Sequence, residues 1–377
     1  MRASIFDNLF VLEMANNHWG DVSRGLKIIS DYAKVVRYNN VRAAMKFQFR
    51  DVDSFIHKDF RHRTDIRYIK KTLDTQLSWA EYQQMATAVR QSSMITMATP
   101  FDEISVEKCV ELGIQIIKIA SSDIKDWFLI EKIATTKKPV IISTGGSSLR
   151  DMDDVVSFFE KRNIPLAINH CVSIYPSEDR ELDLNQIDFL VNRYPHNVIG
   201  YSTHEYRDWR DSTLIAYAKG ARTFERHVDI QAGGIPVSPY CSLPEQVDAW
   251  FKAFAKAEEM CGAAGNAKRI PPEKEVNYLD GLVRGVYAKH DLPAGHILTD
   301  ESVYLAVPLQ RGQISCREMM KGEVLLGPVA KDGAIAFTNI DSPYGVDSQL
   351  ARMIEQRGID PASAGDSTKV VSIPGRG

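Results

Sequence analysis

Short apolar runs recur through the middle of the chain, and each run ends in a few polar residues. Between residues 94 and 228 the runs occupy 94–98, 114–120, 140–142, 166–168, 198–200 and 221–224. They are rich in branched residues, and the segments between them have helical periodicity. This pattern is typical of repeated strand–helix units whose strands form a parallel sheet. Two earlier runs, 10–15 and 43–49, extend it toward the N-terminus.

Polar residues collect at the C-terminal end of the predicted strands. They are Thr99-Pro100-Phe101, Lys118 with Ser121-Ser122-Asp123, Ser143-Thr144-Gly145-Gly146, His170 with Tyr175-Pro176, Ser202-Thr203-His204 and Glu225-Arg226-His227. A (β/α)8 barrel builds its active site at that end of its strands. The sequence therefore predicts an α/β protein whose main part is a (β/α)8 TIM barrel.

Three charged residues interrupt predicted strands that are otherwise apolar: Glu13, Lys46 and Lys118. Each needs a partner, because burying an unpaired charge is costly. Lys46 and Gln48 are two positions apart and so share one face of their strand, which in a barrel is the interior. A bound phosphate or carboxylate would satisfy both lysines. Ion pairs with Glu13 and Asp123 are the alternative.

A loop of small residues follows the run at 140–142. Hydroxyl and glycine residues before a helix, here Ser143-Thr144-Gly145-Gly146-Ser147-Ser148, offer backbone donors and a favourable helix dipole to an anion. An ordinary capped loop has the same composition. The two strand lysines add weight to an anion site.

Three histidines, His170, His204 and His227, fall at the ends of the last three predicted strands. Histidine is the commonest metal ligand, and neighbouring strands could bring His204 and His227 to one ion. Glu13 and Glu225 could then supply oxygen ligands or orient the imidazoles. The alternative is that the histidines serve only as hydrogen-bonding groups.

The segment 51–67, after the second predicted strand, is rich in His, Arg and Asp. We expect it to be a surface excursion. It is either a lid whose Lys58, Arg61, Arg63 and Arg67 attract an anionic substrate, or a solvated charged loop.

The chain divides into a large and a small part. We expect a catalytic barrel over 1–265 and a glycine- and proline-containing linker over 266–282. Short strands and tight turns over 283–341 predict a small β-rich domain. The tail, 342–377, has few aromatic residues and is expected to be poorly ordered, apart from a short helix near 349–357.

Composition excludes several classes of function. A formal net charge of −3, with 25% charged and 44% hydrophobic residues, is that of an ordinary globular protein without the basic excess of nucleic-acid-binding proteins. Five cysteines without paired spacing, and an N-terminus without an export signal, predict free thiols in a reducing cytoplasm. No apolar run reaches the roughly 20 residues that a membrane span requires.

The motifs taken together resemble the sialic acid (N-acetylneuraminate) synthase family. The match runs in order through Leu12-Glu13-Met14-Ala15-Asn16-Asn17-His18-Trp19-Gly20, Lys46-Phe47-Gln48, Thr99-Pro100-Phe101-Asp102, Lys118-Ile119-Ala120-Ser121-Ser122-Asp123, Ser143-Thr144-Gly145, Asn169-His170-Cys171 with Tyr175-Pro176, Gly200-Tyr201-Ser202-Thr203-His204 and Glu225-Arg226-His227. The small β-rich domain resembles the antifreeze-like (SAF) domain of that family.

The resemblance implies a transferase that condenses phosphoenolpyruvate with a sugar aldehyde, giving a 2-keto-3-deoxy sugar acid and phosphate. It assigns phosphoenolpyruvate binding to Lys46, Thr99, Lys118, Ser121, Ser143, Ser173 and Ser202, where Ser173 stands at a position that often holds Asn. It assigns a divalent ion, Mn or Mg, to His204 and His227, catalysis to Glu13 with these two histidines, and acceptor contacts to Gln48 and Tyr175. It also implies a homodimer in which each SAF domain covers the partner's active site.

Departures from the family pattern concern the sugar acceptor. Thr203 replaces a usual Asp, Gly146 a usual Met, and Ser238 an acidic residue that contacts N-acetylmannosamine. Val307-Pro308 stands where an Arg-Pro is usual, and Arg311 is the candidate to replace that arginine. We therefore expect an acceptor other than plain N-acetylmannosamine.

Three alternatives stay open. A legionaminate- or pseudaminate-type synthase would use a 2,4-diacetamido hexose. A metal-dependent barrel aldolase would use histidines and a carboxylate without paired lysines. A binding protein with a decayed site would turn over no aldehyde.

Overall fold

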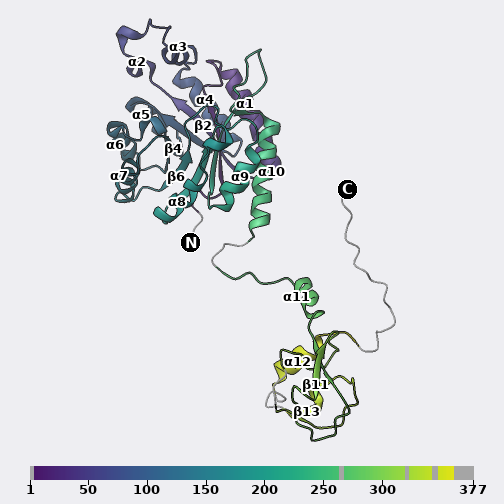
Figure 1. Ribbon diagram of the computed structural model, residues 1–377. Helices are drawn as coiled ribbons and strands as arrows, with labels where there is room; N and C mark the ends of the chain where they lie inside the picture. Colours follow the sequence, from purple (N-terminus) through teal and green to yellow (C-terminus); the bar gives the residue numbers. More distant parts are fainter. Residues whose placement is uncertain (1–3, 263–266, 319–321, 342–346, 361–377) are drawn as a thin grey trace. The chain divides into compact units, whose positions relative to one another are not determined.

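The computed structural model describes residues 4–262, 267–318, 322–341 and 347–360 (Figure 1). The chain forms two compact units, Met1–Gly262 and Ala263–Gly377. Residues 263–266, at the boundary between the predicted barrel and linker, and the end of the predicted tail, 361–377, lie outside the described residues. Among the described helices, none is both long and apolar enough to cross a lipid bilayer.

Eight parallel strands close into a barrel in the first unit, which confirms the predicted (β/α)8 fold. Each strand pairs with the next one along the chain, and β1 also pairs with β8, which closes the sheet. A short strand, β9 (Cys241–Ser242), pairs with the end of β8. The eight strands are β1 (Leu9–Ala15), β2 (Arg42–Phe49), β3 (Ile95–Pro100), β4 (Ile116–Ile119), β5 (Val140–Ser143), β6 (Leu166–Cys171), β7 (Val198–Thr203) and β8 (Thr223–Val228).

Helices between the strands surround the barrel (Figure 1). The helices that follow the eight strands in turn are α1 (Val22–Asn39), α4 (Trp79–Gln91), α5 (Glu103–Glu111), α6 (Trp127–Thr135), α7 (Leu149–Glu160), α8 (Asn185–Arg193), α9 (Trp209–Ala218) and α10 (Pro244–Cys261). Shorter helices lie in the connections: α2 (Val52–Phe55), η1 (Lys58–Phe60), α3 (Arg67–Asp74), η2 (Ser121–Asp123) and η3 (Asp179–Glu181). Side-chain caps fix several helix starts, as where Ser78 and Glu81 form a capping box at α4.

The two-residue period of the strands separates two apolar cores. On β1, Phe10 points outward and packs against the rings of Trp250, Phe251 and Phe254 on α10, at centroid distances of 4.7 to 5.0 Å. The alternate residues point inward and fill the half of the barrel at the N-terminal ends of the strands. They belong to a cluster of Phe6, Leu9, Val11, Ala44, Met97, Ile116, Ile141 and Ala167. The next inward position on β1 is Glu13. Apolar layers therefore fill one half of the interior and leave polar side chains at the C-terminal half.

The segment 51–67 folds as α2, η1 and turns. Two of its basic side chains pair with neighbouring acids: Arg61 lies 2.9 Å from Asp53, and Arg63 lies 2.6 Å from Asp65. Both arginines and both acids are at least partly solvent-exposed. These pairs are those of a solvated charged loop, the second of the two interpretations.

The second unit has two small antiparallel pairs of strands. β10 (Gly285–Ala288) pairs with β11 (Val303–Ala306), and β12 (Val324–Leu325) pairs with β13 (Ile340–Asp341). Two helices, α11 (Glu273–Asp280) and α12 (Ser348–Gln356), and the turn η4 (Phe337–Asn339) complete it. The structure differs from the sequence prediction in one of these segments, because the predicted linker contains α11. The short helix expected near 349–357 is confirmed as α12, which buries Ile354 in the core of the unit.

Candidate active site

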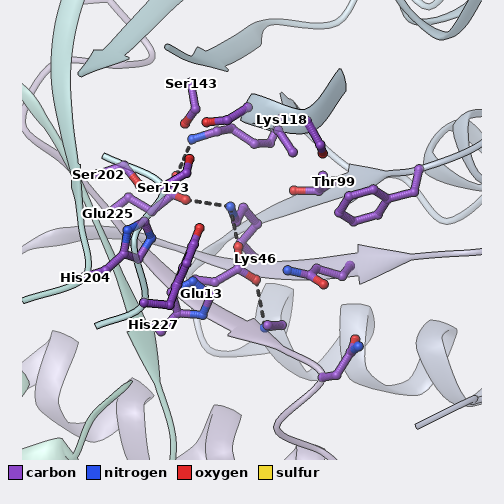
Figure 2. Close-up of a pocket in the computed structure, with 18 of the residues that line it drawn as sticks. Glu13, Lys46, Thr99, Lys118, Ser143, Ser173, Ser202, His204, Glu225 and His227 are labelled. Atoms are coloured by element: carbon purple, nitrogen blue, oxygen red, sulfur yellow. Dashed lines mark hydrogen bonds and ion pairs between the residues drawn. The ribbon is translucent and has the colours of Figure 1, made fainter. Parts of the chain in front are cut away.

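A cavity of about 590 Å³ opens at the C-terminal ends of the barrel strands. All but two of the site residues predicted from the sequence line it: Glu13, Lys46, Gln48, Thr99, Lys118, Ser121, Ser143, Ser173, Tyr175, Ser202, His204 and His227. They come from every strand of the barrel or from the loop that follows it. Figure 2 draws 18 of the residues that line this cavity and labels ten of them, among them both lysines and both histidines.

Four buried charged residues form a chain of ion pairs at the floor of the cavity (Figure 2). Glu225 bridges the two lysines: its Oε1 lies 2.6 Å from Lys46 Nζ and its Oε2 lies 2.7 Å from Lys118 Nζ. Lys46 also pairs with Glu13, directly across the β1–β2 ladder. Ion pairs with carboxylates thus satisfy both lysines. The partner of Lys118 is Glu225, on the opposite side of the barrel, and not Asp123, which the ion-pair alternative had named.

The two carboxylates bond to lysines. From the sequence, Glu13 and Glu225 were candidates to supply metal ligands or to orient the histidines. In the structure, Glu225 bonds to lysines, while Glu13 bonds to Lys46 and accepts a 2.7 Å hydrogen bond from the Ala15 backbone N–H.

Burial and pairing move the pKa values of these four groups in different directions. Burial raises the pKa of Glu13, and the nearby Glu225 charge adds to this effect against the pull of Lys46. For Glu225 burial acts the same way, but its two lysine partners outweigh burial and hold its pKa well below the usual range. Glu225 is therefore a permanent counterion. Glu13 is the carboxylate better suited to accept a proton.

The pKa values of the two lysines are also shifted in opposite directions. Burial alone would lower the pKa of Lys46, but Glu13 and Glu225 outweigh it and hold the pKa above the usual value. Lys118 has a single carboxylate partner, so burial and repulsion from Lys46 lower its pKa. With fewer bonds to carboxylates, Lys118 has more N–H donors left for a ligand.

The hydroxyl groups of Ser121, Ser143 and Ser173 line the same cavity as the lysines. The backbone at Gly145 passes very close to Ser121 and Ser173. The Gly145 N–H donates to Ser121 Oγ at 3.2 Å, and a Cβ at this position would lie 2.2 Å from Ser173 Oγ. Glycine is thus required for the backbone to approach the hydroxyls, as in sites where backbone and side chains surround an anion.

The two predicted metal-binding histidines share one side of the cavity. The rings of His204 and His227 are 5.4 Å apart, and Tyr175 packs on His204 at 3.9 Å. His204 Nδ1 bonds to the carbonyl oxygen of Val172 at 2.9 Å, which places its hydrogen on Nδ1 and leaves the Nε2 lone pair free. Burial lowers the pKa of His204 to about 4 and that of His227 well below its usual value. Both imidazoles are therefore neutral at pH 7, as metal ligands must be.

Within the described residues, no cluster of three or more His, Cys, Asp or Glu side chains is arranged to hold a metal ion. An ion at His204 and His227 would therefore need other ligands as well, from a substrate or from water. The third strand-end histidine, His170, does not line the cavity. Its Nε2 lies 2.7 Å from the carbonyl oxygen of Leu182.

One predicted acceptor-binding residue of the barrel, Ser238, does not line the cavity. Ser238 follows two glycines with positive φ, Gly233 and Gly234, and its carbonyl accepts from the Cys241 N–H at 2.9 Å. The loop then presents Tyr240 to the cavity in its place, with its ring 5.2 Å from that of His227. Arg311 belongs to the second unit.

Part of the cavity wall is cationic, which was not predicted from the sequence. Arg50 lies over the Phe101 ring at 3.8 Å and donates to Gln48 Oε1 at 3.2 Å and to Tyr68 OH at 2.8 Å. Lys71, on α3, lines the same wall. The available signal was the spacing, since Arg50 continues the alternation of Lys46 and Gln48 on β2.

The fold and the cavity define a (β/α)8-barrel protein with a cationic, hydroxyl-rich site at the C-terminal ends of its strands. The sequence profile of the NeuB family matches residues 38–265. The chain belongs to the NeuB family, whose named relatives are sugar-acid synthases.

Individual proteins agree with this assignment. N-acetylneuraminate-9-phosphate synthase of Drosophila melanogaster is 28% identical over 74% of this chain and 74% of its own. N,N'-diacetyllegionaminic acid synthase of Campylobacter jejuni is 24% identical over 85% of this chain and 95% of its own. Among solved structures, one from Chromobacterium violaceum, named after spore coat polysaccharide biosynthesis protein E, is 37% identical. It covers 89% of this chain and 100% of its own, with a TM-score of 0.84.

Proposed function

We propose that this protein condenses phosphoenolpyruvate with a sugar aldehyde to give a 2-keto-3-deoxy sugar acid of the nonulosonic type and free phosphate. The observation that carries the proposal is the meeting of two buried lysines, several hydroxyls and two neutral imidazoles in one cavity. Phosphoenolpyruvate carries a carboxylate and a phosphate, and charge-assisted bonds from ammonium groups and hydroxyls suit both. The names of the relatives support this class of reaction.

In this proposal the anion binds above the ion-paired floor. Lys46 and Lys118 donate to it together with Thr99, Ser121, Ser143, Ser173 and Ser202, while Glu225 holds the two ammonium groups apart at a fixed spacing. A preorganised set of donors loses little freedom when the ligand binds.

The chemical steps follow from the substrates. C3 of phosphoenolpyruvate forms a bond to the aldehyde carbon, and the aldehyde oxygen becomes a hydroxyl. Water then adds to the electron-poor C2, and its proton passes to Glu13, whose raised pKa suits a base. Cleavage of the bond between C2 and the phosphate oxygen releases phosphate, which takes the proton of the C2 hydroxyl and so leaves the keto group. The proton that water gave to Glu13 balances the one that the aldehyde oxygen takes up.

A divalent ion, Mn or Mg, fits the neutral donors of His204 and His227. When bound, it would act as a Lewis acid on the aldehyde oxygen of the acceptor. Gln48 and Tyr175 orient the acceptor at the mouth of the cavity, beside Tyr240 and Arg50.

The proposed acceptor is a sugar aldehyde other than plain N-acetylmannosamine. Ser238, which stands where the family has an acidic contact to N-acetylmannosamine, does not line the cavity. This supports an acceptor other than plain N-acetylmannosamine, and a 2,4-diacetamido hexose, as in legionaminate- or pseudaminate-type synthases, is the second candidate. A relative named for legionaminic acid supports that candidate.

The second unit completes the proposal. By its resemblance to an SAF domain, it would cover the barrel of a partner subunit in a homodimer, with Arg311 reaching the acceptor. The cytoplasm, where phosphoenolpyruvate is made and used, would be the place of action.

Phosphate release tests the reaction class. Purified protein is incubated with phosphoenolpyruvate, Mn²⁺ or Mg²⁺ and a panel of hexoses that includes N-acetylmannosamine and 2,4-diacetamido hexoses. A synthase releases phosphate only when an accepted aldehyde is present, and mass spectrometry finds the condensed acid. An aldolase would join pyruvate to the aldehyde without consuming phosphoenolpyruvate, and a binding protein would form no product. Either result would overturn the proposal.

A further inference from the structure

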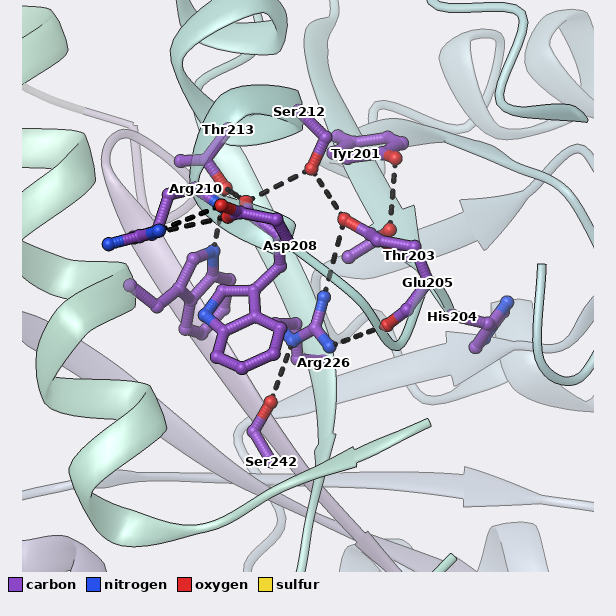
Figure 3. Close-up of polar contacts among 12 residues, drawn as sticks. Tyr201, Thr203, His204, Glu205, Asp208, Arg210, Ser212, Thr213, Arg226 and Ser242 are labelled. Carbon is purple, nitrogen blue, oxygen red and sulfur yellow. Dashed lines mark hydrogen bonds and ion pairs between the residues drawn. The ribbon is translucent and has the colours of Figure 1, made fainter. Parts of the chain in front are cut away.

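Arg226 lies between two cavity residues of β8, Glu225 and His227, but does not itself line the cavity. Figure 3 shows its guanidinium beside Glu205 and Ser242. The alternation of a strand requires this: Glu225 and His227 face the barrel interior, and Arg226 faces the helix layer. There its Nε donates to Ser242 Oγ of β9 at 2.9 Å, and its guanidinium lies 4.9 Å from the Trp209 ring of α9. The side chain is almost completely buried, at 1% exposure.

Glu205 is the counterpart of Arg226 on the neighbouring strand end. It follows His204 directly and is fully buried outside the cavity. Arg226 Nη2 donates to the carbonyl oxygen of Glu205 at 2.9 Å, and Nη1 lies 3.3 Å from its Oε1. Ser212 Oγ donates to the same Oε1. Arg226, the residue before His227, is therefore bonded to Glu205, the residue after His204.

The connection reaches a third element of the site. The Ser177 N–H donates to the carbonyl oxygen of His204 at 3.2 Å, and Ser177 and Glu205 form a parallel bridge. Ser177 follows Tyr175 in the loop after β6, and Tyr175 packs on His204. Arg226 and this loop therefore bond to neighbouring carbonyl groups of the same segment, those of Glu205 and His204.

Stability alone is a poor explanation for this ion pair. Burial lowers the pKa of Arg226 despite the attraction of Glu205. Glu205 Oε2 has no hydrogen-bond partner within the described part of the chain. Replacing a buried ion pair by apolar residues of similar volume is often neutral or stabilising, so such a pair is weak evidence for a gain in stability. What the pair provides here is a fixed geometry between two strand ends.

We infer that Arg226 and Glu205 are positioning residues, which hold His204 and His227 at the spacing needed to share one divalent ion. The inference rests on the proposed function, because that proposal assigns the ion to these histidines. Groups that orient metal ligands from outside the coordination shell commonly change metal affinity by about 10- to 100-fold when they are removed.

The test measures Mn²⁺ affinity directly, from the electron paramagnetic resonance signal of free Mn²⁺ titrated into the full-length protein. We expect Arg226→Met and Glu205→Gln each to weaken Mn²⁺ binding by about 10- to 100-fold. Phosphoenolpyruvate binding without metal, measured by calorimetry, should stay unchanged. Because the two residues act through one contact, the double variant should bind Mn²⁺ no more weakly than the weaker single variant. Arg226→Lys keeps the charge without the fork of donors, and should lie between wild type and Arg226→Met.

Arg24→Met is the matched control. Arg24 is another buried arginine of the barrel, and its Nη2 lies 2.7 Å from Asp229 Oδ1, without contact to Glu205 or Ser242 in the described structure. It should lower the melting temperature and leave Mn²⁺ affinity as in wild type.

Several results would overturn the inference. They are wild-type Mn²⁺ affinity in a folded Arg226→Met variant, equal weakening in Arg24→Met, additive losses in the double variant, or no Mn²⁺ binding by the wild type. If Arg226→Met does not fold, Arg226→Lys and Glu205→Gln carry the same test. If the wild type binds Mn²⁺ and the variants lose it, but no aldehyde elicits phosphate release, the positioning role stands and the proposed reaction fails.

Discussion

At the scale of single residues, Glu13 and Lys118 belong to one buried cluster, and burial moves both pKa values toward neutrality. The proposed reaction needs Glu13 ionised and Lys118 protonated. The value of kcat/KM should therefore fall as pH falls through the raised pKa of Glu13, and fall again as pH rises through the lowered pKa of Lys118. A pH–rate profile should show a bell narrower than the ordinary values of 4.5 and 10.5 would give.

Two variants test which group causes the acid limb and which causes the alkaline limb of that pH–rate profile. Glu13→Gln should lower kcat by about 100-fold or more and remove the acid limb from the residual activity, with phosphoenolpyruvate affinity retained. Lys118→Arg should shift the alkaline limb upward, because a guanidinium does not lose its proton in this range. An acid limb that persists in Glu13→Gln would show that another group titrates.

At the scale of elements, Arg50 joins the end of β2 to α3 across the acceptor side of the cavity. Its hydrogen bonds hold Gln48 and Tyr68, and each such bond contributes about 0.5 to 1.5 kcal/mol. We expect Arg50→Met to raise the KM for the sugar acceptor by about 10-fold and to change the KM for phosphoenolpyruvate much less. Steady-state kinetics with each substrate varied in turn measures the difference.

Arg162 provides a control with the same kind of contact. It lies over the Phe158 ring at 3.6 Å and donates to the Phe158 carbonyl, and neither residue lines the cavity. Arg162→Met should leave both KM values unchanged. An equal rise for both substrates in Arg50→Met would contradict a role on the acceptor side.

At the scale of the whole molecule, the sequence was sufficient to predict the barrel, because recurring apolar runs and the helical periodicity between them are local patterns. The alternation of a strand predicted that Lys46 and Gln48 share the interior, and most of the candidate site followed from strand ends that a closed barrel must bring together. The partner of Lys118 was beyond such reasoning. Glu225 lies 107 positions away and reaches it across the barrel, so only the closed fold brings the two together.

Loops account for most of the remaining misses. Ser238 and Tyr240 are two residues apart, and which of them faces the cavity depends on the turn at Gly233 and Gly234. Lys71 reaches the cavity from α3, a helix that begins where the predicted excursion 51–67 ends and for which the sequence made no prediction. Patterns of residue type describe neither turn geometry nor the docking of short helices.

The proposed homodimer makes a prediction at this same scale. If Arg311 acts on the partner's barrel, Glu13→Gln and Arg311→Ala should each be nearly inactive alone. Mixed and allowed to exchange subunits, they should recover up to about a quarter of wild-type activity, because half of the dimers then have one intact site of two. Rate measurements after mixing check this, and the absence of recovery in dimers shown to exchange would contradict a shared site.

The central claim is that two buried ammonium groups seat an enol phosphate in this cavity. Calorimetric titration of phosphoenolpyruvate into the wild type and into Lys118→Met tests it most directly. The account predicts saturable binding to the wild type and affinity at least about 10-fold weaker in the variant, since a charged hydrogen bond contributes about 1.5 to 3 kcal/mol. Equal affinity in both folded proteins would contradict it.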